Sequence, residues 1–525
     1  MIKNLFLPVC LFISIQINAQ LPEDAIRMGW TIPSGTARQQ AIGGAMGSLG
    51  GELSALFVNP AGLGMYKTGE FVLSPGISFL KGKSEFRGTK AATDRSSKFT
   101  FGTSGAVWGY SDRNSRWAGK AFSIGVNRTA NFNNTIRYNG LNNYSSFTEP
   151  IANEFFDFYT QQKQSNPSLA NKIIIDNALN SPDISLQTKM ALYTYLVDID
   201  TTNGQNTIFS RAERVVDLNQ ENTITTKGGI TEVAFGFAGN MDNKLFLGGS
   251  IGVPIVNYER TLVYRESDIV NTQNNFNYSR FEEEYTSKGI GINAKLGLIF
   301  KPADFIRIGL AMHTPSMYGL KDNFSSKLVT DVEQLFAPAS GVDSVGSTAF
   351  SGGQDPGIKY DLLTPWKFML SGSYVFREAE DITTQKGFIT ADVEYATYKS
   401  SQFSAADESV GNDYYKDVNS AVKQIYKNAF NFRVGGELKF KTLMTRLGFA
   451  RYGKPYNDKN LKARKMNISG GVGYRNKGVF VDLTYIHSLN KDVNFPYRLD
   501  PPRSNTFADL RESNGNVLVT VGLKF

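Results

Sequence analysis

Apolar and polar residues alternate along the chain from about Gly69 to its end, in segments of roughly ten residues bounded by Gly, Asn, Asp or Pro. A period of two is typical of β-strands that present different faces to different surroundings. In the last segment one face carries Val517, Val519, Val521, Leu523 and Phe525, and the other carries Asn516, Thr520, Gly522 and Lys524.

This alternation suits either a soluble sandwich or an outer-membrane barrel, in which the apolar face meets lipid and the polar face lines the lumen. Two features favour the barrel. Aromatic residues gather at strand ends, as interface girdles do. The chain also ends on Phe525, which we interpret as a signal for the barrel assembly machinery. The strand-end aromatics are Trp108, Tyr110, Trp117, Trp366, Tyr374, Phe376 and Tyr485.

The pattern predicts an all-β fold, a transmembrane antiparallel barrel of about 14 strands, and an even number lets a single chain close. Short connections alternate with long ones, and we expect the short ones on the periplasmic side and the long ones outside. The predicted strands are 69–80, 98–111, 117–131, 229–240, 244–264, 279–300, 305–319, 365–377, 386–404, 428–441, 443–455, 464–476, 478–489 and 514–525.

The N-terminus indicates export to the outer membrane of a Gram-negative bacterium. Lys3 precedes a short apolar run, and the small residue Ala19 suits cleavage by signal peptidase, so residues 1–19 are predicted to be a signal peptide. The single cysteine, Cys10, lies inside it, which excludes disulfides and thiolate metal sites from the mature chain. The formal charge of +8 is spread along the chain without a basic block, so nucleic acid is not an expected partner.

Residues 20–68, between the signal and the barrel of residues 69–525, are rich in small and apolar residues. Pro60 fixes its own φ and moves Asn59 away from the helical region, so the chain bends sharply inside this segment. An apolar segment that precedes a closed barrel can lie either in the periplasm or inside the lumen. Its composition favours the lumen, where small residues allow close backbone packing, and we expect a hatch that plugs the barrel.

The sequence "ARQQAIGGAMGSLGGELSALFVNPAGL" ahead of fourteen strands and a terminal Phe resembles the FadL family of outer-membrane transporters, which includes TodX-like importers. The family's Asn-Pro-Ala hatch motif falls here on Asn59, Pro60 and Ala61, followed by Gly62. The resemblance implies passive uptake of hydrophobic compounds such as long-chain fatty acids or aromatic hydrocarbons. Ligand would collect in an external groove, reach a site above the hatch, and leave when the hatch shifts or through a lateral opening.

The longest predicted loop, 132–228, contains three stretches of helical periodicity, in which Ile151, Phe155, Phe158 and Tyr159 lie near one face. One interpretation is a cap that packs its own small core. The other is an external apolar groove where a lipophilic ligand first binds.

A carboxylate headgroup would need cationic or amide donors in the lumen. The parity of the strands directs Arg307, Lys367 and Lys295 inward, and we take these as candidate headgroup ligands. The alternative is that they belong to a charge network that braces a wide barrel.

Enzyme chemistry is not expected. The two histidines, His313 and His487, fall on different strands without a nucleophile elbow, and they are a weak basis for haem ligation. The acidic run Glu282–Glu284 is interpreted as a solvated strand end rather than a cation site. No cofactor and no metal are expected.

Besides a hydrophobic ligand, the expected partners are outer-membrane lipid, lipopolysaccharide and the assembly machinery. A second class of function stays open, because some FadL-like barrels, the PorV type among them, act as partners in protein secretion without transporting small molecules.

Overall fold

The computed structural model describes residues 22–525 except 113, 203, 216, 271–272, 356, 377–385, 407–412, 460, 462 and 501. The predicted signal peptide, residues 20–21 of the predicted hatch and the short connection 378–385 between the predicted strands 365–377 and 386–404 lie outside the described residues. No described helix is long and apolar enough to cross a membrane.

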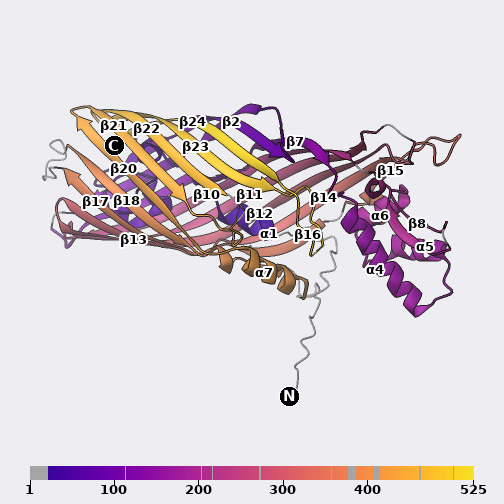
Figure 1. Ribbon diagram of the computed structural model, residues 1–525. Coiled ribbons are helices and arrows are strands. Elements are labelled where there is room, and N and C mark those ends of the chain that lie inside the picture. Colours follow the sequence, from indigo (N-terminus) through magenta and orange to yellow (C-terminus); the bar gives the residue numbers. More distant parts are fainter. Residues whose placement is uncertain are drawn as a thin grey trace, which may run out of the picture.

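The chain folds into a closed antiparallel barrel of 14 strands, which confirms the predicted fold class (Figure 1). Several barrel strands are interrupted and therefore comprise two consecutive elements. In chain order the strands are β1 (Glu70–Leu73) with β2 (Pro75–Phe86), β4 (Asp94–Phe101) with β5 (Ser104–Ser111), β6 (Trp117–Asn131) with β7 (Asn134–Asn142), β10 (Leu218–Met241), β11 (Leu245–Asp268), β12 (Tyr278–Ala303), β13 (Ile306–His313) with β14 (Met317–Asp331), β16 (Gly357–Leu363) with β17 (Lys367–Phe376), β18 (Gly387–Ala396) with β19 (Gln402–Ala405), β20 (Ala429–Phe440), β21 (Leu443–Tyr452), β22 (Arg464–Asn476), β23 (Val479–Asn494) and β24 (Ala508–Lys524).

The barrel closes where the first strand pairs with the last. β1 and β24 are antiparallel neighbours, with Glu70 opposite Lys524. The terminal Phe525 takes part in this closure, because its backbone N–H donates to Gly69 O at 3.0 Å and its carbonyl accepts from Gly69 N–H at 2.8 Å. This pairing joins the first and the last strand of the sheet, as a barrel in a lipid environment requires.

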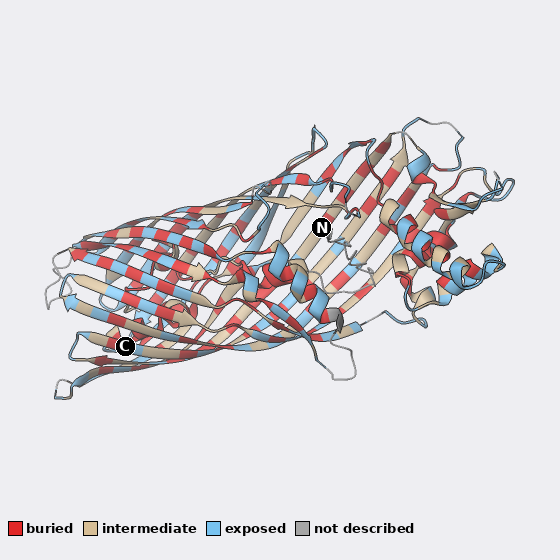
Figure 2. Cartoon of the chain, turned by 60° about the horizontal axis from the view of Figure 1, so that its bottom comes forward, coloured by how far each residue is buried: buried red, intermediate tan, exposed pale blue. Residues whose placement is uncertain are grey.

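Buried and exposed residues alternate along the strands, as Figure 2 shows. On β23 the buried side chains are those of Phe480, Asp482, Thr484 and Ile486, whereas Val479, Val481, Leu483 and Tyr485 are exposed. The exposed apolar face meets lipid and the buried, partly polar face lines the lumen, as predicted.

The strands on either side of the longest loop extend well beyond their predicted ends, because β7 continues the strand predicted to end at 131 and β10 begins at Leu218 rather than at 229. β10 and β11 have 24 residues each and β12 has 26, whereas about 9–11 tilted residues suffice to cross a bilayer. These strands continue to the end of the barrel that carries the helices of the long loop (Figure 1), so their outer halves are longer than a bilayer requires. Residues 134–142 and 218–228, which the sequence pattern assigned to the loop 132–228, are therefore strand. The polar, Thr-rich sequence of these outer halves lacks the apolar alternation of a lipid-facing wall.

The outer end carries small additional elements, and the expected helical character of the long loop is confirmed. Its helices pack beside the outer halves of β11 and β14 (Figure 1). The elements of the long loop are α4 (Glu149–Ser165), α5 (Asn171–Asn180), α6 (Leu186–Tyr193), β8 (Val197–Asp200), β9 (Thr207–Ser210) and η2 (Ala212–Arg214). Other loops contain β3 (Thr89–Lys90), β15 (Val342–Gly346), η3 (Ser347–Phe350), η5 (Tyr398–Ser400) and α7 (Asp413–Ile425).

The N-terminal segment lies inside the barrel in two layers. α1 (Pro22–Gly29) packs at the outer level, where Ile26 and Met28 join a buried cluster with Tyr360, Tyr398 and Tyr415. Residues 37–66, the hatch core, lie at the inner level and contain α2 (Ala37–Ala41), α3 (Ala55–Val58) and η1 (Pro60–Met65). Residues 31–36, the strap, connect the two layers.

Glycines on the inner face of the wall let the hatch core approach the strands closely. A Cβ added at Gly248 on β11 would lie 2.5 Å from Pro60 O, and one added at Gly309 on β13 would overlap Gly47 O. On β20 and β21, Cβ atoms added at Gly435 and Gly448 would overlap Ile42. The hatch backbone therefore contacts the wall backbone on separate parts of the barrel.

A substitution at Gly309 tests this contact. We expect Gly309→Ala to lower the free energy of unfolding by about 1–3 kcal/mol, because the methyl group displaces Gly47 from the wall. The measurement is the urea concentration at the midpoint of unfolding in lipid vesicles, with tryptophan fluorescence as the signal. The control is Gly372→Ala on the adjacent strand, where an added Cβ meets no atom within 4 Å. Equal midpoints for the two variants would contradict the close contact.

Candidate functional site

A cavity of about 120 Å³ lies between the two layers of the N-terminal segment. Residues of α1 and the strap line one side, and residues of α2, α3 and the wall line the other. Its polar lining is mixed with apolar side chains, and the lining includes Met28, Pro33, Val58, His313, Lys367 and Arg433.

Asn59 anchors the floor of this cavity to the wall. Its side chain is fully buried, and Nδ2 donates to the carbonyl oxygens of Gly47 at 2.5 Å, Leu298 at 3.2 Å and Leu310 at 3.2 Å. Leu298 belongs to β12 and Leu310 to β13, so one amide joins the hatch to two strands. A Cβ added at Gly297 would overlap Asn59 Oδ1, which explains why the amide fits there.

The remaining motif residues form the bend beside Asn59. Asn59 Oδ1 accepts from the Ala61 N–H at 3.2 Å, and Pro60 occupies the first position of η1, where a missing N–H has no cost. Gly62 is tightly packed, since an added Cβ would lie 2.7 Å from Leu49 O. The motif thus combines a wall contact with a compact turn.

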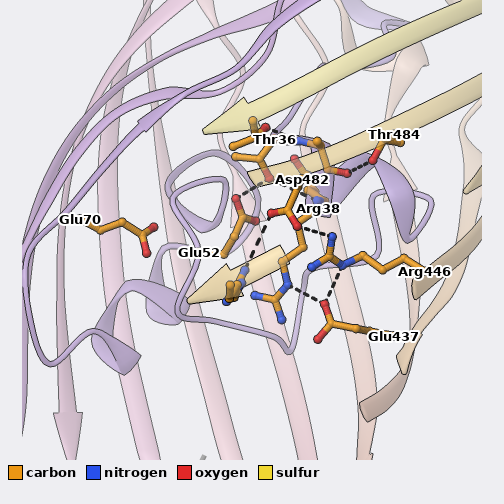
Figure 3. A network of polar contacts seen from close by, with 12 residues as sticks. Thr36, Arg38, Glu52, Glu70, Glu437, Arg446, Asp482 and Thr484 are labelled. Carbon is orange, nitrogen blue, oxygen red and sulfur yellow. Dashed lines mark hydrogen bonds and ion pairs between the residues drawn. The ribbon is translucent and has the colours of Figure 1, made fainter. Parts of the chain in front are cut away.

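Buried ion pairs fix the other side of the hatch core (Figure 3). Arg38 on α2 donates from Nε to Glu437 Oε2 at 3.1 Å. Arg446 on β21 donates to the same oxygen at 2.7 Å and to Asp482 Oδ1 at 2.5 Å. The side chains of Arg446 and Asp482 are completely buried, so both charges depend on their partners.

Glu52 gathers hydroxyl donors at the start of the hatch core. Its Oε1 accepts from Thr36 Oγ1 at 2.6 Å and from Ser54 Oγ at 3.0 Å. Burial raises the pKa of the Glu52 carboxyl, and the donors from Thr36 and the charge of Arg38 only partly offset this. Thr36 is also the last residue of the strap, so this cluster ties the strap to the hatch core.

The structure places two of the three candidate headgroup ligands at the cavity. Lys295 forms an ion pair with Glu232 and donates to Asn293 Oδ1 at 2.8 Å. Lys367 also lines the cavity, and the ion pairs between described residues do not include its ammonium group. Arg307 lies elsewhere, beside Met65 at the end of η1, with Nη1 to Sδ at 3.5 Å.

Further charged groups share the cavity with Lys367. Arg433 on β20 pairs with Glu394 on β18 at 2.9 Å. His313 lies within 2.8 Å of Val58 O, at the end of α3. The inward parity of Glu394 and Arg433 was visible in the sequence, but only the barrel register brings them to one level. Lys367 is thus the cavity cation without a carboxylate partner among the described residues.

The wall is incompletely paired beside the cavity. The hydrogen-bonded register between β5 and β6 ends at Ser104 opposite Val126. Beyond that point β4 pairs with β2, and β7 pairs with β10. We call the gap between β4 and β6 the seam.

The strap fills the seam. Ser34 N–H donates to Arg128 O at 2.8 Å, and Asn127 Nδ2 donates to Ser34 O at 3.0 Å. On the other side, a Cβ added at Gly102 would overlap Gly35 O. The strap backbone therefore satisfies the free edge of β6 at the level of the cavity.

The external helices bury much of the apolar face predicted for them. Ile151, Phe155 and Tyr159 of α4 join a buried cluster with Phe147 and Tyr264, and Phe158 is partly buried against it. The helices accordingly pack a core with the outer barrel end.

The remaining histidines and acidic residues singled out in the sequence do not form a metal site or a catalytic cluster among the described residues. No group of three or more His, Cys, Asp or Glu side chains there is arranged to hold a metal. In the acidic run, Glu282 pairs with Arg280 at 2.8 Å and Glu283 pairs with Arg260. His487 contacts Tyr485 and Ser513 on the outer part of the wall.

No family model and no curated protein matches the chain. Among solved structures, it is similar to a Pseudomonas aeruginosa FadL homologue, with 12% identity and a TM-score of 0.53 over 95% of this chain and 100% of the other. The toluene transporters TodX of P. putida and TbuX of Ralstonia pickettii also align, with 14% and 13% identity and TM-scores of 0.46 and 0.45. These alignments cover 94% of this chain and 99% of each transporter. The chain therefore has the FadL-like fold, a 14-stranded outer-membrane barrel with an internal hatch.

Proposed function

We propose that this protein is an outer-membrane channel for the passive uptake of hydrophobic small molecules. The observation that carries the proposal is the cavity above a seated hatch, placed beside a seam that only the strap closes. Such molecules cross a polar saccharide layer poorly, and a protein path that shields them from water lowers this barrier.

The route follows from the relative strength of the two closures. Moving the hatch core separates Arg38 from Glu437, and breaking a buried pair of this kind costs about 3–5 kcal/mol. Moving strap residues 31–35 out of the seam breaks the two hydrogen bonds of Ser34 and the one from Gln40 to Pro33 O, which contribute about 0.5–1.5 kcal/mol each. Thr36 stays bonded to Glu52. The strap is therefore the part that opens, and ligand leaves sideways into the membrane through the seam.

The cavity chemistry favours a ligand with an anionic end. Lys367 offers an ammonium group to the cavity, and a carboxylate placed there would gain a charge-assisted hydrogen bond. A cavity of about 120 Å³ holds only the headgroup end of a long fatty acid. The chain of such a ligand would extend toward the strap, past Met28 and Pro33.

Uptake by cells tests the function. Labelled long-chain fatty acid and a labelled small arene are supplied to cells with the intact protein, with the Asn59→Ala/Pro60→Ala double variant, or with neither. We expect uptake to require the barrel and to change in the double variant, because the floor of the cavity loses its anchor. Immunodetection and heat-modifiable migration establish that each barrel is folded in the outer membrane.

Two outcomes contradict these assignments. Equal uptake in all three strains would exclude transport of these ligands and favour the alternative role as a partner in protein secretion, which co-purification with secretion components would then support. Uptake that needs the barrel but is unchanged in the double variant would show that transport does not depend on the anchor that Asn59 and Pro60 give to the cavity floor.

Lys367→Met tests the headgroup assignment. We expect the variant to take up limiting fatty acid about tenfold more slowly, since it loses one charge-assisted hydrogen bond. Uptake of the uncharged arene should not change. The control is Lys81→Met on the exposed outer wall, which should leave both rates unchanged. An equal loss for fatty acid and arene would indicate a packing defect and contradict a role in recognising the carboxylate.

A further inference from the structure

A shallow recess lies on the outer, lipid-facing surface of the barrel, away from the lumen. It spans five adjacent strands, from β5 through β6, β10 and β11 to β12, and has a volume of about 780 Å³. Its lining is largely aromatic and aliphatic and includes Trp108, Tyr110, Trp117, Phe122, Phe237 and Leu296.

Two outward-facing glycines make the floor of the recess. The strand register places Gly239 of β10 beside Leu247 of β11, and Phe237 of β10 beside Gly249 of β11, so the two glycines are diagonal neighbours. The Trp117 ring lies over Gly239, since an added Cβ would be 2.7 Å from its Cζ3. An added Cβ at Gly249 would be 3.4 Å from a Leu296 methyl group.

Stacked aromatic rings form the wall of the recess on the side of β5. The Trp108 and Phe122 rings stack with centroids 5.6 Å apart, and Phe122 contacts Phe237 at 4.9 Å. All three rings are on the lipid side and belong to one cross-strand row. The next row toward the strand ends is Tyr110, Lys120 and Gly239. The recess is therefore apolar along its length and polar at one end.

Lys120 is a cation at the edge of a lipid-facing surface. It is exposed on the outer face of β6, beside Phe122 in the recess lining. Among the residues that the structure describes, no carboxylate pairs with its ammonium group. A lysine in contact with hydrocarbon is costly unless its ammonium group reaches the headgroup level, where phosphate is available.

The position along the strands identifies the leaflet. Lys120 lies opposite Gly239, two residues before β10 ends at Met241. The adjoining connections, 112–116 and 242–244, are among the short ones, which mark the periplasmic end. The phosphate nearest to Lys120 is thus that of a glycerophospholipid in the periplasmic leaflet.

We propose that this recess is a binding site for one glycerophospholipid of the periplasmic leaflet, with an acyl chain over Gly249 and against the Trp117 ring that covers Gly239, and with the phosphate on Lys120. The Tyr110 hydroxyl, in the same row, is the second polar group at the headgroup end. The glycine floor and the aromatic wall suit the apolar acyl chains of such a lipid, and the cation at one end suits its phosphate. The site is independent of the transported ligand.

Native mass spectrometry of the detergent-solubilised full-length protein tests the site. The probes are dioleoyl phosphatidylethanolamine, dioleoyl phosphatidylglycerol and dioleoylglycerol, which has the same chains without phosphate. We expect both phospholipids to bind one per barrel, at least tenfold more tightly than dioleoylglycerol. Lys120→Gln should reduce phospholipid affinity to that of dioleoylglycerol, because the charge-assisted bond is lost.

A matched pair of glycine substitutions tests the floor. Gly249→Leu fills the recess and should weaken binding of all three lipids. The control is Gly470→Leu on β22, where an added Cβ has nearly the same surroundings, 3.3 Å from a Leu447 methyl group and 3.7 Å from Arg446 O. This control should bind like the wild type.

Two results would overturn the proposal. Equal affinity for phospholipid and dioleoylglycerol, or an unchanged phospholipid affinity in Lys120→Gln, would show that Lys120 only extends to the interface. Equal binding by Gly249→Leu and Gly470→Leu would show that the recess is ordinary lipid-facing wall. The comparison of phospholipid with dioleoylglycerol uses the wild type, so it stands even if Gly249→Leu does not fold.

Discussion

The close contact between hatch backbone and barrel wall is the constraint on which the rest of this structure depends. A 14-stranded barrel has a lumen too wide for its own side chains to fill, and here residues 37–66 fill it. They reach the strands only because glycines such as Gly248, Gly309 and Gly435 lack the Cβ that would displace them. The Asn59 amide fixes the position of the hatch along the wall, because its three carbonyl acceptors come from the hatch and from two strands.

Buried ion pairs also hold the hatch core against the wall. Glu437 accepts from Arg38 of the hatch and from Arg446 of the wall, so one carboxylate bonds the hatch core to the barrel. Such a pair is costly to break in a buried setting, whereas the strap crosses the seam with two hydrogen bonds of Ser34. The molecule therefore has one firm closure and one weak closure, and the cavity lies between them.

The sequence predicts the barrel well because a period of two reports which face of a strand meets lipid. It also indicates the bend at Asn59 and Pro60, since turn chemistry is local. It does not reveal that α1 forms a separate outer layer or that Gly309 meets Gly47, because both depend on the register of strands far apart in the chain. Glycine in a strand suggests only weakness or a bulge until its partner is known. Lys367 and Lys295 were placed inward by parity, whereas their different pairing required the structure.

Uptake with the hatch core locked to the wall tests the account most directly. Ser48 and Ser371 have their hydroxyl oxygens 2.8 Å apart, one on the hatch core and one on β17, so cysteines at both positions are placed to form a disulfide. The account predicts that oxidation of the Ser48→Cys/Ser371→Cys pair leaves fatty-acid uptake unchanged, because ligand leaves through the seam. Loss of uptake on oxidation, restored by reduction, would contradict it and show that the hatch core itself moves.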